Sequence, residues 1–309
     1  MPSLETFGLR VAELSDVDGL AAELGRTPAE RPHVVRLDPS TDGAALRDLV
    51  VRPTWIHWVC PITAGATDLM AKQSKQQRYR TRTAVRAMAA MTMEVSDPVD
   101  QDRYDEWLEL YTAQVETMRH GVDMATRYRA MVVAPGSRHL LVGWRRGGRL
   151  VCGCVVRIDP DAGALVTRFS AVASDAQDRE WARAMYSALA DLAAARGLRW
   201  FSLGNDMNFY GSMVMPGLCA YKLRLGFRPV PADLLGNRSC RTVAERVTSV
   251  AGLALPVLRW EYRQSRDPSA TVEDFVDGSA ALRLTSVVPA GVTNTVLDSL
   301  PEHRRLVLA

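Results

Sequence analysis

The 309-residue chain has very little lysine, although it is rich in arginine. Of its 38 basic residues, three are lysines: Lys72, Lys75 and Lys222. A lysine in a chain that otherwise uses arginine offers a compact ammonium with three donors, and not charge alone. The alternative for each lysine is an ordinary solvated residue on a helix face. Lys222 is the most informative of the three because it lies in the most regular part of the sequence.

The sequence also lacks the patterns of several common protein classes. No stretch reaches about 18 apolar residues without a charge, so no transmembrane helix is expected. The first residues lack a basic segment followed by an apolar one, so we expect no signal peptide and a cytoplasmic protein. The net charge of +3 does not by itself call for a nucleic-acid partner. There is no P-loop, G-x-G-x-x-G or G-x-S-x-G pattern, so kinase, dinucleotide-binding and hydrolase functions have no support.

Cysteine and histidine do not form a metal-binding pattern. Five scattered cysteines include the C-x-C pair Cys152 and Cys154, without a second pair at zinc spacing, and we expect reduced, mostly buried thiols. H-E-x-x-H is missing, so no metal site is predicted. His57, between Trp55 and Trp58 on an expected strand, is interpreted as a core histidine.

The second half of the chain has the clearest pattern of secondary structure. An Ala-rich helix leads through Gly197 into a short aromatic strand, and a polar loop then precedes another helix. Gly147-Gly148 predicts a hairpin turn between two earlier strands. The expected order is βββ-α-β-α-β, with strands at 138–146, 149–159 and 164–173, helix 177–196, strand 199–204, helix 217–225 and strand 226–231.

Within this region the sequence GLCAYKLRLGFRP follows the pattern G-L-x-x-[aromatic]-K-x-x-x-G-F-x-P. It resembles the C-terminal half of the Fem-like transferases, an offshoot of the GNAT acyltransferases that moves aminoacyl groups from tRNA to amines. The resemblance covers roughly residues 68–231. It implies an α/β, tandem GNAT-like fold with a reduced N-terminal unit over 1–95 and a complete second GNAT unit over 96–235. Residues 236–309 would then form a C-terminal extension that completes a sheet or covers the cleft.

Outside the resembling region we expect less regular structure. The pattern of residues 1–62 predicts a small βαβαβ segment that includes a helix at 42–50. Beyond residue 235 the pattern suggests a helix at 241–253 and strands at 281–288 and 304–308.

The resemblance implies an N-acyltransferase that takes an aminoacyl group from charged tRNA, without a cofactor, and forms an amide with a small-molecule or peptide amine. The alternative is the same fold with acyl-CoA as donor. Phosphate groups bind well at helix N-termini, but the expected site at 173–184 has no glycine and holds Asp175, Asp178 and Glu180. These acids disfavour a pyrophosphate there. A further alternative is an inactive module that binds a partner or nucleic acid.

The candidate site residues follow from this resemblance and from the chemistry. By resemblance, Lys222 contacts the donor or the developing charge, with Tyr221 at the adjacent aromatic position. Aminolysis of an ester builds an oxyanion that a cation or N–H donor stabilises, and we expect the Lys222 ammonium to be solvated at the cleft. Asp206, with Asn205 beside it just beyond strand 199–204, is the candidate base for the amine proton; a turn or capping role is the alternative. Tyr210 in the same loop is a candidate substrate-binding residue.

A basic helix is expected over 68–91, as one helix or two joined at Ser74. Spacing of three and four residues places one set of cations on a shared face: Lys75, Arg78, Arg82 and Arg86. Such a face suits the phosphates of a tRNA donor, and Tyr79 is compatible with base stacking. A plain solvated face is the alternative. Ala84, Val85, Met88 and Met91 are expected to anchor the later turns of the helix.

Overall fold

The computed structural model describes residues 4–6, 9–27, 30–38, 49–118, 121–174, 180–211, 214–250, 257–263, 266–289 and 303–308. The protein is a mixed α/β chain, as predicted. It divides into two compact units, each made of separate segments of the chain. Unit 1 comprises Met1–Trp58, Asn205–Leu223 and Arg228–Ala309, and unit 2 comprises Val59–Gly204 and Arg224–Phe227. The predicted division of the chain at residues 95 and 235 into two GNAT-like units and a C-terminal extension stays a prediction.

Unit 2 contains the core of the predicted GNAT-like order. Its strands follow one another in the sheet as β10-β9-β8-β7-β6. Neighbours are antiparallel from β6 to β9, and β9 and β10 are parallel. The bounds are β6 Thr92–Ser96, α4 Gln101–Glu116, α5 Met124–Val132, β7 His139–Arg146, β8 Arg149–Asp159, β9 Ala164–Val172, α6 Trp181–Ala195 and β10 Trp200–Met207. With α7 (Pro216–Arg224) and β11 (Arg228–Pro231), the chain order confirms the predicted βββ-α-β-α-β. Helix α5 has no counterpart among the elements predicted from the sequence.

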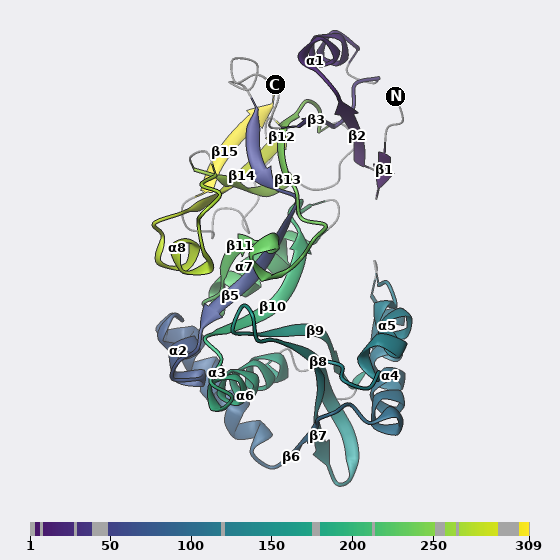
Figure 1. The fold of residues 1–309 in the computed structure, drawn as a ribbon, viewed down its shortest axis with the longest axis vertical. Coiled ribbons are helices and arrows are strands. Elements are labelled where there is room, and N and C mark those ends of the chain that lie inside the picture. The colour runs from purple at the N-terminus through teal and green to yellow at the C-terminus, as the bar shows by residue number, and fades with distance from the viewer. Residues whose placement is uncertain are drawn as a thin grey trace. The chain divides into compact units, whose positions relative to one another are not determined.

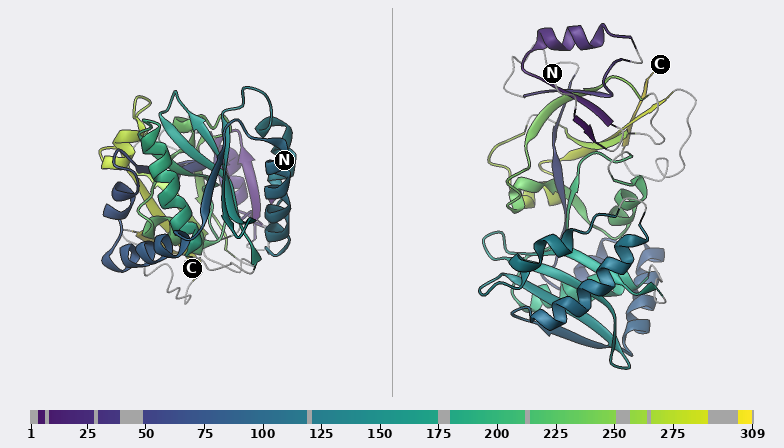
Figure 2. Two further views of the ribbon diagram at one scale, coloured as in Figure 1. Left: turned by 90° about the horizontal axis from the view of Figure 1, so that it is seen from below. Right: turned by 90° about the vertical axis from the view of Figure 1, so that its right-hand side faces the viewer.

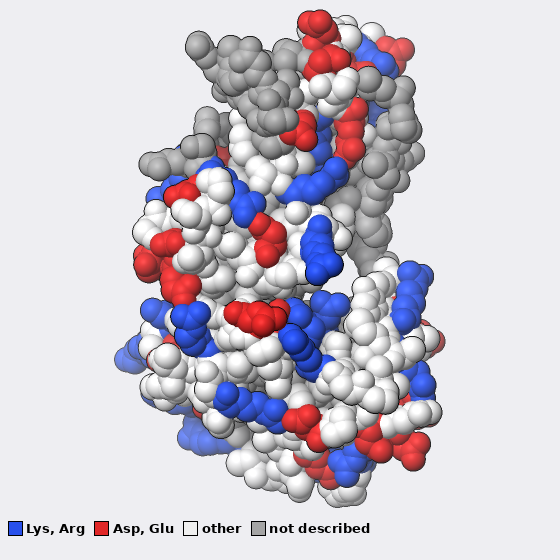
Figure 3. All heavy atoms as spheres, viewed as in Figure 1, with Lys and Arg blue, Asp and Glu red and all other residues white. Residues whose placement is uncertain are grey.

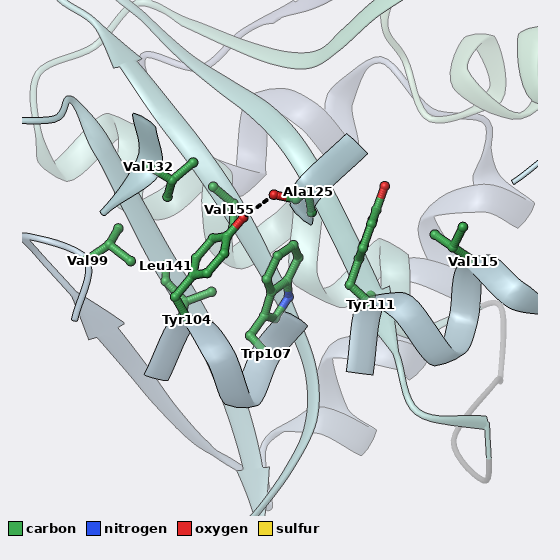
Figure 4. Close-up of a cluster of buried hydrophobic side chains, with 10 residues drawn as sticks. Val99, Tyr104, Trp107, Tyr111, Val115, Ala125, Val132, Leu141 and Val155 are labelled. Atoms are coloured by element: carbon green, nitrogen blue, oxygen red, sulfur yellow. Dashed lines mark hydrogen bonds between the residues drawn. The ribbon is translucent and has the colours of Figure 1, made fainter. Parts of the chain in front are cut away.

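Helices cover both faces of the sheet of unit 2, with α4 and α5 on one face and α3 (Lys75–Met88) and α6 on the other (Figures 1 and 2). Helix α4 presents Tyr104, Trp107 and Tyr111 to the sheet, as its aromatic spacing predicts (Figure 4). The Tyr104 hydroxyl donates to the Ala125 carbonyl at 2.9 Å, which ties α4 to the start of α5. This aromatic layer holds one face of unit 2 together.

Strands β9 and β10 separate after a short paired stretch. Among the described residues of both strands, parallel pairing joins Ala164–Val166 to Trp200–Ser202, although β9 continues to Val172. Gly204 lies where the strands part, with φ of 79°. A Cβ at this position would come within 2.7 Å of the Thr167 carbonyl oxygen, so only glycine fits.

Unit 1 contains two sheets together with helices α1 and α8 and most of α7. One sheet has the order β1-β2-β3-β12-β4 and the other the order β13-β14-β15. Valines of β2, β3, β12, β13 and β14 form a shared core with Phe209, and α1 packs with a second cluster of the first sheet. The bounds are β1 Leu4–Thr6, β2 Leu9–Leu14, α1 Val17–Leu24, β3 Val34–Leu37, β4 Val50–Pro53, β12 Thr242–Val247, β13 Val257–Tyr262, α8 Val272–Asp277, β14 Leu282–Pro289 and β15 His303–Leu308. A 3-10 helix at Ala232–Leu235 precedes β12, and β5 (Trp55–Pro61) follows β4.

The C-terminal segment therefore completes a sheet, which is one of the two expected alternatives. The helix predicted at 241–253 is wrong over its described part, because β12 pairs with β3 and β4 on its two sides. The β-branched residues Thr242, Val243 and Val247 suit this central strand. The strands predicted at 281–288 and 304–308 are confirmed as β14 and β15. The helix predicted at 42–50 lies almost entirely outside the described residues.

A buried ion cluster lies at the centre of unit 1, which we call the Glu245 cluster: Glu245, Arg36, Arg52 and Arg259. The Glu245 carboxylate accepts from Arg52 Nε at 2.5 Å and Nη2 at 2.7 Å. Arg259 Nη1 donates to the same carboxylate at 3.0 Å, and Arg36 Nε lies 3.4 Å from it. The attraction of these arginines outweighs the effect of burial and lowers the pKa of Glu245 to about 2. The four side chains come from four strands, so the cluster fixes how these strands pack.

Candidate active site

Asp206 is the hub of a second buried polar cluster in unit 1. Asn205 and Asp206 were expected in the loop after the strand. Strand β10 extends to Met207, so both residues belong to the end of the strand. Lys222 Nζ on α7 lies 2.8 Å from both Asp206 carboxylate oxygens. Trp58 Nε1 donates to Asp206 Oδ2 at 2.8 Å and the Tyr210 hydroxyl donates to it at 3.0 Å. We call these four residues the Asp206 cluster.

Lys222 is buried, which contradicts the expectation of a solvated ammonium. Its exposed fraction is 6%, and it shares the inner side of α7 with Cys219 and Ala220. The ion pair with Asp206 replaces the water that the ammonium loses, and burial without such a partner would be very costly. Burial lowers the pKa of Lys222, and the Asp206 charge opposes this shift. The resemblance identified an important residue, but not its buried setting.

Tyr210 and Trp58 complete the cluster as neutral donors. Both are fully buried, and Trp58 Nε1 also lies 3.2 Å from the Tyr210 hydroxyl oxygen. Burial raises the pKa of Tyr210 well above its usual value, and the neighbouring Asp206 charge raises it further. Tyr210 therefore stays protonated at neutral pH and donates to Asp206. Lys222 Nζ also lies 5.8 Å from the centre of the Trp58 ring, within the range of a cation–π contact.

Asn208 holds this part of the chain in place, a role that the sequence analysis missed. Its side-chain amide donates to the Pro53 and Trp260 carbonyls at 2.8 and 2.7 Å, and its Oδ1 accepts from the Trp260 N–H at 2.7 Å. Tyr210 and Leu258 exchange two backbone hydrogen bonds at 2.7 and 2.8 Å. These hydrogen bonds join the segment after β10, which carries Tyr210 of the Asp206 cluster, to β13. The partners of Asn208 are about 50 or 150 residues away, so no local sequence signal reveals them.

The arrangement limits what Asp206 can do as a base. An ionised carboxylate has about four lone-pair sites, and Asp206 already accepts four contacts from three side chains. To take a proton from an amine, Asp206 would have to release one of these donors. Its role as the base stays a prediction. Asn205 and Tyr221 are half-buried sequence neighbours of Asp206 and Lys222, and their predicted roles also remain open.

The basic helix of unit 2 is confirmed as two helices joined at Ser74. Helix α2 covers Ala66–Ala71, and the Ser74 hydroxyl caps α3 by accepting from Gln77 N at 3.3 Å. The inner side of α3 carries Gln77, Thr81, Ala84 and Met88. Val85 is 40% exposed, so its expected role as an anchor is wrong.

The predicted cationic face of α3 is largely open to solvent. Lys75, Arg82 and Arg86 are exposed, and no ion pair involves them in the part of the chain that the structure describes. Arg78 differs because it is half-buried and its Nη1 donates to the Gln73 carbonyl at 2.5 Å. On the face of the molecule shown in Figure 3, basic and acidic side chains are intermixed.

The start of α6 shows how one of the expected acids is neutralised. Glu180 forms an ion pair with Arg80 of α3 and lies 3.0 Å from Arg183 Nε, and Arg183 is buried. Arg146 stacks over the neighbouring Trp181 ring at 4.8 Å. The negative charge of Glu180 is therefore compensated locally. Asp175 and Asp178 lie outside the described residues.

Metal and membrane features are not found within the described ranges. These residues contain no group of three potential metal ligands. None of the helices in the described part of the chain is long and apolar enough to cross a membrane. The five cysteines are free thiols, four of them buried, and His57 is buried, in agreement with the expectations.

Solved structures with a similar chain trace match this chain at low sequence identity. FemX is 12% identical, with a TM-score of 0.46, and the match covers 75% of this chain and 80% of FemX. The C-terminal domain of a putative lysylphosphatidylglycerol synthetase from Agrobacterium fabrum is 13% identical, with a TM-score of 0.43 and coverage of 79% of both chains. L-PGS from Bacillus licheniformis is 12% identical, with a TM-score of 0.45, over 69% of this chain and 67% of L-PGS.

No protein-family model matches the chain, and no curated protein sequence matches it. Because the TM-scores of these structures lie below 0.5, they carry no functional argument. Any functional conclusion therefore depends on the chain's own residues.

Proposed function

We propose that the chain is an amide-forming N-acyltransferase that transfers an aminoacyl group from charged tRNA to an amine of a small molecule or peptide. The observation that carries this proposal is the setting of the lysine in the G-L-x-x-Y-K pattern. Lys222 is buried in the Asp206 cluster at the end of β10, and both oxygens of Asp206 accept from it. A buried charged pair with a perturbed pKa is a strong candidate for function.

The chemistry needs a donor for a developing oxyanion. The amine nitrogen attacks the ester carbonyl, a C–N bond forms, and the C–O bond to the ribose breaks. The proton lost by the amine ends on the departing ribose hydroxyl. An ammonium has three N–H donors, and Asp206 accepts two of those of Lys222. We assign the third N–H to the oxyanion, with Asp206 and Trp58 fixing its direction.

The tRNA donor is proposed from the exposed face of α3. Lys75, Arg82 and Arg86 are cations exposed to solvent, and binding of a polyanion would release counterions at such a face. The acyl-CoA alternative keeps one supporting observation. Glu180 at the start of α6 is paired with arginines, so this acid repels a pyrophosphate less than the sequence suggested.

The test uses the purified chain with tRNA charged by a mixture of radiolabelled amino acids, in the presence of small amines and short peptides. Mild base hydrolyses the ester of charged tRNA but leaves an amide intact, so base-stable label measures transfer. We expect base-stable label that disappears when the charged tRNA is digested with ribonuclease beforehand. Transfer that survives complete digestion contradicts the tRNA donor. A parallel reaction with labelled acetyl-CoA and longer acyl-CoAs tests the alternative.

A further inference from the structure

Three basic side chains lie on adjacent strands of unit 2, on the face that α4 and α5 cover. His139 on β7 is directly opposite Arg157 on β8. Leu141 and Val155, two residues further along these strands, belong to the buried cluster that contains the aromatic residues of α4. Side chains two residues apart on a strand point to the same face. His139 and Arg157 therefore also point to the face that α4 covers. Arg168 is the extra residue where the β8–β9 register shifts. Its guanidinium lies 5.5 Å from the centre of the Tyr128 ring on α5, so it points to the same face.

These basic groups have too few acceptors around them. Arg157 pairs with Asp159 at 3.0 Å, and Asp159 is the carboxylate that faces this group on β8. Within the described residues, Arg168 forms no ion pair, and its Nε is buried without a hydrogen-bond partner. The carbon of the guanidinium lies 5.5 Å from the centre of the Tyr128 ring and 5.9 Å from that of Phe169, and the Tyr128 side chain also hydrogen-bonds to Arg168. Arg168 is half-buried, so water screens its charge only in part, and an anionic ligand would supply the countercharge that no carboxylate of the described residues provides.

His139 adds a second unpaired donor. Its exposed fraction is 5%, and its Nδ1 lies 2.7 Å from the Ser137 hydroxyl oxygen. We assign the hydroxyl proton to the bond with Nδ1, so that Ser137 Oγ donates to the ring and accepts from the His139 backbone N–H at 3.3 Å. The ring proton is then on Nε2, which is buried without a partner in the described part of the chain. Burial lowers the pKa of His139 to about 4, with smaller effects from Arg168 and Arg157, so the ring is neutral at pH 7.

We infer that Arg168 and His139 form a binding site for an oxyanion, a carboxylate or a phosphate group carried by a substrate. Arg168 supplies the charge, and His139 Nε2 supplies a directed N–H. The site adjoins Thr167, whose carbonyl lies beside Gly204 where β9 and β10 part, and on this ground we assign the anion to a substrate. The inference rests on the proposed function only in assigning the anion to a substrate.

Anion binding is tested without the transfer reaction, so its outcome does not depend on the proposed function. Calorimetry with the full chain at pH 7 measures binding of inorganic phosphate and of acetate, with sodium chloride keeping the ionic strength constant. We expect one of the two anions to bind, and Arg168→Gln to weaken that binding by about tenfold or more. Arg138→Gln is the matched control. It removes the same charge one residue from His139, and Arg138 is exposed and paired with Asp161.

A nuclear magnetic resonance titration of His139 checks the site directly. The bound anion should raise the pKa of the His139 ring, because a nearby negative charge favours the imidazolium. Phosphate binding alone indicates a phosphate group, and acetate binding indicates a carboxylate. The inference is overturned if neither anion binds, if Arg168→Gln binds as well as Arg138→Gln, or if the bound anion leaves the His139 titration unchanged. Circular dichroism confirms that each variant is folded.

Discussion

The two buried ion clusters of unit 1 are built differently, although each centres on a single carboxylate. In the Glu245 cluster, arginines from three other strands surround the acid, and Arg52 alone fills two of its acceptor sites. In the Asp206 cluster, one lysine and two aromatic donors surround an acid at the end of a strand. Burial of charge alone therefore does not identify a functional site. Lys222 has an N–H that Asp206 does not use and lies near the end of a strand, so it can stabilise charge on a substrate. The Glu245 carboxylate is enclosed by arginine guanidinium groups, which favours a role in holding the strands together.

The largest effect is expected from breaking the Glu245 cluster. Glu245→Gln leaves Arg52 and Arg259 buried without a countercharge, which should lower the free energy of unfolding by about 3–5 kcal/mol. Urea denaturation measures this change. Glu109→Gln, an exposed acid on α4, is the control and should change stability by less than about 0.5 kcal/mol. Turnover per folded molecule of Glu245→Gln should stay near that of the wild type, and a large loss would give this cluster a role in catalysis.

Substitution of Lys222 should affect both stability and activity. Lys222→Ala removes one partner of a buried pair, so stability should fall by about 3–5 kcal/mol. Turnover of the folded fraction should fall by about 10²- to 10³-fold, as for the loss of one oxyanion donor. Lys222→Arg should rescue poorly, because a planar fork does not fit where a compact ammonium lies. Full activity in Lys222→Arg would mean that charge alone matters at this position.

The Glu245 cluster should also dominate the acid side of the stability profile. The folded pKa of Glu245, about 2, lies below its ordinary value of 4.5, so the folded state favours the ionised form. Its contribution is therefore complete above pH 4.5 and is lost as the pH falls toward 2; the difference corresponds to about 3 kcal/mol. Unfolding measured across this range should show the loss in the wild type. The same loss in Glu245→Gln would assign it to other groups.

The smallest effect on the fold is expected from α3, where the cations are exposed. A variant with Gln at Lys75, Arg82 and Arg86 should bind tRNA more weakly, and the log–log salt slope should fall by roughly 0.7 to 0.9 for each phosphate that is no longer neutralised. Arg78 is kept because its guanidinium bonds to the Gln73 carbonyl. Arg127→Gln, an exposed cation on α5, serves as the control. Unchanged tRNA affinity in the triple variant would leave α3 as a solvated face.

Local patterns predicted most elements of both units, but they missed α5 in unit 2 and gave β12 of unit 1 as a helix. The Gly147-Gly148 turn, the aromatic stripe of α4 and the Ser74 cap are each encoded by neighbouring residues. Strand β12 was mistaken for a helix because its status depends on pairing with β3 and β4, about 200 residues away. Whether a polar side chain is buried likewise depends on residues that are distant in the sequence.

The candidate site shows the same limit. The lysine was found because it is rare and lies in a recognisable pattern, and Asp206 and Tyr210 were found from the loop in which they were thought to lie. Trp58 and Asn208 were not assigned to the site, because their partners come from distant segments. The expectation of a solvated Lys222 was wrong because the sequence of its helix does not indicate that the Asp206 carboxylate of β10 lies next to the ammonium.

The central claim is that the Asp206 cluster serves catalysis beyond stability, and a double-mutant cycle tests it most directly. The unfolding free energy and the turnover per folded molecule are measured for Lys222→Met, Asp206→Asn and the double variant. Each single variant leaves a buried polar group without its partner, whereas the double variant removes both charges. We predict that the double variant regains most of the lost stability while its turnover stays reduced by about 10²- to 10³-fold. Recovery of turnover together with stability would contradict the claim and make Lys222 and Asp206 a structural pair.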